Sequence, residues 1–150
     1  MRRWLYPDVV DVQTSLGLLL PRISSGVALA FHGWPKIQNP FGWMGPEAPV
    51  PGVLQFLAAL SEFGGGIALA VGFLTRIASL GIAVTMAVAA GMVHIAAGDP
   101  FVSTTGGKSW ELAAIYFACA VLFLLTGPGR FSLDAVLFGR PAGAPTGSMR

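Results

Sequence analysis

The chain has 150 residues, of which 54% are apolar and only 11% are charged. Soluble proteins carry roughly 25% charged residues, so these few charges cannot cover the surface of a water-soluble globule of this size. The composition therefore excludes an ordinary soluble enzyme, a nucleic-acid binder and a disordered chain. The net charge of +2 is too small to indicate a polyanion site.

Cysteine is almost absent, because Cys119 is the only one. A single cysteine excludes an internal disulfide, a CxxC motif and a thiolate metal cluster. The thiol chemistry of a quinone-linked four-helix oxidoreductase needs paired cysteines, so this chain cannot perform it by itself.

Four apolar stretches are long enough, or nearly so, to cross a bilayer core about 30 Å thick, which takes about 20 helical residues. They cover residues 16–34, 52–75, 77–98 and 110–127. We therefore predict an all-α integral membrane protein, a four-transmembrane-helix bundle, within one membrane domain of residues 1–138. The lipid bilayer is its expected surroundings.

The connections agree with four spans. Residues 35–51 hold five prolines and are expected to form an irregular loop, and Thr75 and Arg76 are expected to form a tight turn between the second and third spans. The fourth span should stop at Gly127-Pro128-Gly129, because proline cannot continue the helix. The tail of residues 139–150 has the composition of a disordered end.

Small residues predict where the helices touch, since small faces let helices approach closely in lipid. One such face on the third span carries Ala83, Ala87 and Gly91, and the second span is crowded with residues 64–66, Ala70 and Gly72. Packing is the expected role of both.

Arginine and lysine predict the orientation. Six of them flank the spans on the side of the N-terminus and two, Lys36 and Lys108, flank the other side. This bias predicts that both termini lie in the cytoplasm of a multi-pass protein of the plasma membrane.

Two charges lie well inside predicted spans. At 1.5 Å per residue, Arg22 is about 9 Å from the inner end and Glu62 about 15 Å from the outer end. Because an unpaired charge at mid-membrane costs at least about 2.5 kcal/mol, we expect an Arg22–Glu62 ion pair. Such a pair could be structural or could form the floor of a ligand cavity.

A second polar group is expected in the outer half of the bundle, with contributions from all four spans. The predicted ligand-binding residues are His32, Lys36, Glu62, His94 and Glu111. Two histidines and carboxylates also suit a metal, and His32 and His94 at one level suit haem b. A quinone head group fits better, because it dissolves in the bilayer and its carbonyls need donors near the interface.

Several segments together resemble the DoxX family of bacterial membrane proteins, and the likeness extends over about residues 16–138. In the first half of the chain it lies in residues 22–26, 30–36, 60–65 and 72–76. In the second half it lies in His94 and in residues 107–112 and 127–134. Pro35, next to Lys36, departs from the family pattern.

The resemblance implies a four-helix bundle in the bacterial plasma membrane. It also implies a membrane component of an oxidoreductase complex in sulfur or oxidative-stress metabolism, with a quinone and a soluble redox or sulfur-transfer protein as partners. No covalently bound cofactor, metal or nucleic acid is expected. A small transporter with a Glu/His proton relay and a structural assembly subunit without ligand remain alternative functions. A homo-oligomer is a further expected partner arrangement.

The orientation can be tested with single cysteines introduced at Gln38 and Ser148 in a chain lacking Cys119. An impermeant maleimide applied to intact cells should label position 38 and not position 148, because the charge bias places residues 35–51 outside. The opposite labelling would contradict the predicted topology.

Overall fold

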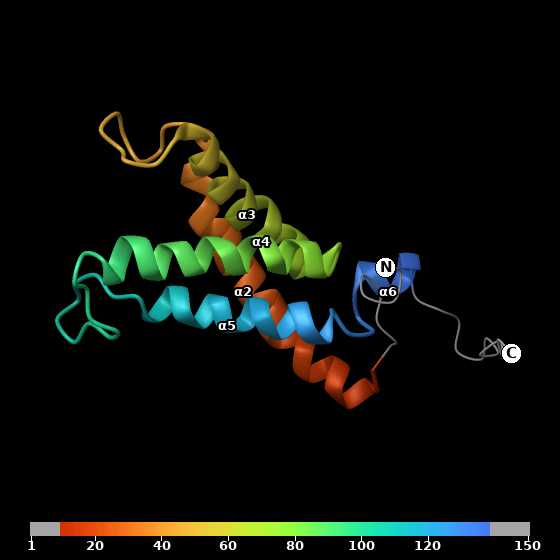
Figure 1. The fold of residues 1–150 in the computed structure, drawn as a ribbon. Helices are drawn as coiled ribbons and strands as arrows, with labels where there is room; N and C mark the ends of the chain where they lie inside the picture. The colour runs from red at the N-terminus through yellow and green to blue at the C-terminus, as the bar shows by residue number, and fades with distance from the viewer. Residues whose placement is uncertain (1–9, 139–150) are drawn as a thin grey trace, which may run out of the picture.

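The computed structural model describes residues 10–138, and these form four long helical segments and one short helix (Figure 1). Three segments are long and apolar enough to cross a membrane, and the fourth is a shorter apolar helix. In chain order the elements are α2 (Val12–Gln38), α3 (Gly52–Val71), α4 (Thr75–Val88) continued by the π-helix η1 (Ala89–Ile95), α5 (Glu111–Thr126) and α6 (Leu133–Phe138).

The predicted four-helix membrane bundle is confirmed, and no strand occurs among residues 10–138. The helices pack as α2 on α3, α3 on α4 and α4 on α5. Figure 1 shows α4 and α5 running alongside one another while α2 and α3 cross them at an angle. We call the end with residues 39–51 and 96–110 the loop end and the end with residues 72–74 and 127–132 the turn end.

The turn between the second and third spans differs from the prediction. Thr75 and Arg76 already belong to α4, and the chain reverses at residues 72–74. Gly72 and Leu74 both have positive φ angles, of 71° and 44°. A glycine tolerates this backbone region readily, so the turn falls on Gly72 rather than on the polar pair after it.

Helix α2 is longer than its predicted span because it is capped before the apolar run and is not broken by proline. The Asp11 carboxylate accepts hydrogen bonds from the backbone N–H and the hydroxyl of Thr14. These bonds, first that of the Thr14 hydroxyl, hold the pKa of Asp11 below its usual value. Pro21 and Pro35 both lie inside the helix, as membrane helices allow, so His32 and Lys36 share one continuous helix.

Glycines bring the backbones of α2 and α3 almost into contact. A Cβ atom placed on Gly33 would lie 2.3 Å from the backbone nitrogen of Phe63. One on Gly26 would lie 2.6 Å from the nitrogen of Ala70, and one on Gly66 2.6 Å from that of Ala30. Only glycine fits at these positions, and the close approach allows extensive dispersion contact where lipid offers no hydrophobic drive.

The small residues predicted to lie at helix contacts do so on the second span but only in part on the third. Gly66 and Ala70 of α3 do lie at a helix contact, as predicted. The predicted face on the third span does not act as a single contact, because Ala83 is buried while Ala87 and Gly91 are exposed. A Cβ atom on Gly91 would meet nothing within 4 Å, so a small residue there serves no packing among residues 10–138.

Polar side chains fasten the turn end. The Arg22 guanidinium, 2% exposed, donates hydrogen bonds to the carbonyl oxygens of Pro128 and Phe131. The Asp134 carboxylate accepts from the backbone N–H groups of Leu74 and Thr75, at 2.8 and 2.9 Å. Asp134 thus caps α4 from a distant part of the chain.

Two further bonds complete this end of the bundle. The N–H of Arg130 donates to the hydroxyl of Ser15 at 3.1 Å, and the Arg76 guanidinium donates to the carbonyl of Leu125 at 2.9 Å. The backbone groups freed where α5 stops at Gly127-Pro128-Gly129, as predicted, therefore find partners inside the protein. Residues 139–150, predicted to be disordered, lie outside the described residues.

The glycine contact can be tested by comparing two substitutions in α2. Gly33→Ala should lower the melting temperature in detergent, because overpacking typically costs about 1–3 kcal/mol. Gly17→Ala is the matched control, since a Cβ atom there meets nothing within 4 Å and alanine favours the helix by about 1 kcal/mol. Equal melting temperatures for the two variants would show that the close approach at Gly33 does not exist.

Candidate functional site

Lys36 and Glu62 form an ion pair toward the loop end of the bundle. The Lys36 Nζ lies 2.6 Å from Glu62 Oε1, joining α2 to α3. The Glu62 side chain is 5% exposed and that of Lys36 is 25% exposed. Glu62 is therefore a buried carboxylate, and the Lys36 cation that contacts it is partly exposed.

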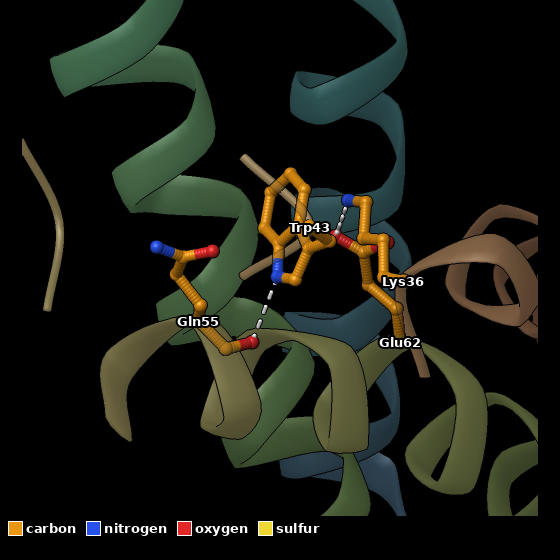
Figure 2. Close-up of polar contacts among 4 residues, drawn as sticks. All are labelled: Lys36, Trp43, Gln55 and Glu62. Carbon is orange, nitrogen blue, oxygen red and sulfur yellow. Dashed lines mark hydrogen bonds and ion pairs between the residues drawn. The ribbon is translucent and has the colours of Figure 1, made fainter. Parts of the chain in front are cut away.

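Trp43 covers the ammonium group of Lys36. Its ring centroid lies 4.6 Å from Nζ, within the range of a cation–π contact. Figure 2 shows Lys36 and Glu62 meeting on one side of the indole while its N–H points the other way, to Gln55. The aromatic surface, the ammonium and the carboxylate thus form one continuous group.

Gln55 holds Trp43 and the loop before α3 in place. Its backbone carbonyl accepts from the Trp43 Nε1–H at 3.0 Å, and its side-chain oxygen accepts from the backbone N–H of Met44 at 3.1 Å. Its side-chain nitrogen donates to the carbonyl of Val50 at 2.9 Å. Phe41 stacks on Phe56 with the ring centroids 5.2 Å apart. These contacts fix the position of the indole over Lys36.

The pair leaves hydrogen-bonding capacity unused. Glu62 Oε2 is buried and has no hydrogen-bond partner. An ammonium carries three donors, and Lys36 uses one of them on Glu62 Oε1. A buried polar atom without a partner costs free energy, so a ligand that bonds to it would be favoured. The site offers such a ligand the remaining donors of Lys36 Nζ and the acceptor Glu62 Oε2.

The predicted Arg22–Glu62 ion pair is wrong. Glu62 binds Lys36, and Arg22 binds the carbonyls at the turn end. The main reason is the register of α2 on α3. A Cβ atom on Gly33 would lie 2.8 Å from the backbone carbon of Glu62, so Glu62 lies at the level of Gly33, roughly 16 Å along α2 from Arg22. Side chains also lean toward the N-terminus of their helix. Arg22 on α2 leans toward the turn end, whereas Glu62 on the oppositely directed α3 leans toward the loop end and meets Lys36.

The other predicted site residues pair off separately. His32 is exposed and packs edge-on against Tyr116 of α5, with the ring centroids 5.9 Å apart. His94 Nδ1 lies 2.8 Å from Asp99 Oδ2. Glu111 begins α5, and its backbone N–H donates to the carbonyl of Phe101 at 3.0 Å.

The structure thus brings two of the five predicted residues together. Within residues 10–138, no hydrogen bond or ion pair joins His32, His94 or Glu111 to one another or to the Lys36–Glu62 pair. Within the same range, no three histidine, cysteine or acidic side chains converge as metal ligands.

The site predicted from the sequence lacks both Gln55 and Trp43. Gln55 is the one polar side chain among residues 52–60, in the first half of α3, and it is 3% exposed. A lone amide in an apolar span is a signal that could have been used, since such groups are expected to be hydrogen-bonded. Its hydrogen-bond partners lie in an irregular loop, and the conformation of such a loop cannot be predicted from sequence periodicity.

Comparison with known proteins shows the family of the chain. The model of the DoxX family matches residues 17–95. The chain belongs to the DoxX family. The match covers α2 from Gly17 onward, α3, α4 and η1, and it therefore contains Lys36, Trp43, Gln55 and Glu62. The resemblance found in the sequence is confirmed.

This DoxX-family chain is also 32% identical over 127 residues to the inner membrane protein YqjF of Escherichia coli strain K12. The alignment covers 81% of this chain and 92% of the relative. No solved structure matches. The likeness and the helices together identify a multi-pass inner-membrane protein.

The revised pairing makes a prediction about coupling. Removing one partner of a buried ion pair costs about 3–5 kcal/mol, with Lys36→Met near the lower end because Lys36 is partly exposed. The losses from Lys36→Met and Glu62→Gln should be strongly non-additive in melting experiments in detergent. Those from Arg22→Gln and Glu62→Gln should add, because these residues share no partner. Coupling of Arg22 rather than Lys36 to Glu62 would contradict the structure.

Proposed function

We propose that this DoxX-family protein binds a quinone or a similar redox ligand at Lys36 and Glu62 and serves as a membrane component of an oxidoreductase complex. The observation that carries the proposal is the buried Glu62 Oε2 without a partner, beside an ammonium group with unused donors. No other polar centre among residues 10–138 combines these features with an aromatic surface at the same place.

The chemistry of a quinone fits the residues. A quinone carbonyl can accept a hydrogen bond from Lys36 Nζ, and the hydroxyl of the reduced quinol can donate one to Glu62 Oε2. The Trp43 ring offers a flat apolar surface for the quinone ring, since aromatic pairs stack favourably. Both redox forms would therefore find a complementary partner in the same ion pair.

The chain supplies binding and orientation, and the two-electron, two-proton redox chemistry belongs to the quinone. Electrons would come from a soluble redox or sulfur-transfer protein, in sulfur or oxidative-stress metabolism. With both termini in the cytoplasm, as the charge bias predicts, Lys36 and Glu62 would lie in the outer half of the bilayer.

The binding step can be tested by titrating a short-chain water-soluble quinone into the purified protein and following tryptophan fluorescence. The parent should show saturable quenching that decreases strongly in a Trp43→Phe variant. Lys36→Met should weaken binding about tenfold or more, because a hydrogen bond to a charged group contributes about 1.5–3 kcal/mol. Lipid extraction and mass spectrometry of the parent should also recover a co-purified quinone.

Lys108→Met is the matched control, since Lys108 is an exposed lysine of the 96–110 loop. It should bind the quinone like the parent. Equal affinities for the parent and Lys36→Met would contradict the proposed site. An empty parent without saturable quenching would contradict quinone binding altogether and would leave a transporter or a structural subunit, which solute uptake into liposomes would distinguish.

A further inference from the structure

Helix α6 is held at the level where two membrane spans end. The backbone N–H of Asp134 donates to the carbonyl of Gly72 at 2.8 Å, and its carboxylate caps the start of α4 at Leu74 and Thr75. Asp134 is 5% exposed, so this face of α6 is docked on the α3–α4 turn. Figure 1 shows α6 beside the turn end of the bundle.

The large side chains next to Asp134, on α6 and in the segment before it, are apolar and exposed. Val136 is 77% exposed and Leu137 58% exposed, and Leu133 and Phe131 beside them are also exposed. These large apolar side chains surround a single docked carboxylate. Water would solvate such a surface poorly.

The surroundings of this surface indicate what covers it. Phe73 and Ile77, on the turn and the first turn of α4 that Asp134 caps, are exposed apolar residues. Leu125, in the last turn of α5, is 70% exposed. In a protein whose spans face lipid, exposed apolar side chains at the ends of those spans lie in the bilayer. The apolar side of α6 continues this lipid-facing surface.

We propose that α6 is an interfacial helix, with Val136 and Leu137 inserted into the boundary between head groups and acyl chains of the leaflet at the turn end. Such helices lie in the membrane plane with their apolar face immersed. Arg130, exposed and two residues before Ser132, supplies a cation at the same level, which suits the phosphates of anionic head groups. Asp134 attaches α6 to the α3–α4 turn, and Val136 and Leu137 contact lipid.

The proposal can be tested with nitroxide labels on the full chain in vesicles of phosphatidylethanolamine and phosphatidylglycerol. Single cysteines at Val136 and, separately, Leu137 are introduced in a Cys119→Ala background. Leu125→Cys is the lipid-facing reference and Glu47→Cys, in the exposed loop at the other end, is the aqueous reference. Collision rates with oxygen and with a water-soluble nickel chelate are measured for each.

Labels at 136 and 137 should collide with oxygen several-fold more, relative to the nickel chelate, than the label at 47, and should approach the value at 125. Ratios equal to that at position 47 would place α6 in water and overturn the proposal. Low collision rates with both reagents would mean that another protein surface, such as a second copy of the chain, covers α6, which would equally overturn it. If one variant does not fold, the other position carries the test.

Discussion

Where a chain leaves a helix in an apolar medium, its freed carbonyl groups need donors from within the protein, because lipid supplies none. Arg22 meets this need at the end of α5 by donating to the carbonyls of Pro128 and Phe131. The bond joins the first span to the segment after the last one, and that segment in turn carries Asp134 to the start of α4. A single buried guanidinium therefore closes the bundle by tying α2 to α5 and, through Asp134, to α4. Its charge is tolerated at this depth because the carbonyl dipoles around it replace water.

Helix direction divides the remaining polar groups into two centres. Long side chains lean toward the N-terminus of their helix, so on α2 both Arg22 and Lys36 lean the same way. Arg22 lies near the turn end, so its side chain points to the segment beyond the end of the span. Lys36 lies near the loop end, so its side chain points toward the middle of the bundle and contacts Glu62. One centre fastens the fold: the two terminal nitrogens of Arg22 and the carboxylate of Asp134 are hydrogen-bonded, and Arg22 Nε is buried without a partner. The other has an unused acceptor in a buried carboxylate, which is the arrangement that suits a ligand.

The helices can be predicted from the sequence, but the partners of the buried polar side chains cannot. Apolar run length predicts a span directly, because bilayer thickness sets it, and the four spans were found with errors of a few residues at their ends. Arg22 and Glu62 were assigned to each other from the depth of their backbone positions alone. Depth counted from the predicted span ends neglects how α2 and α3 are shifted along one another. In the structure Glu62 lies beside Gly33, eleven residues from Arg22. Gln55 and Asp134 depend on irregular segments brought close by the fold, for which sequence spacing carries no signal.

The glycine contact between α2 and α3 has a mechanical consequence. Backbones that touch without intervening side chains have nothing to repack, so the two helices cannot slide past one another without steric collision at Gly26, Gly33 and Gly66. Lys36 and Glu62 are both carried on this stiff pair of helices. The pair of α4 and α5 meets this stiff pair through side chains, by the packing of α3 on α4 and by the ring contact of Tyr116 with His32. Displacement of α4 and α5 would therefore repack side chains while leaving the distance between Lys36 and Glu62 unchanged.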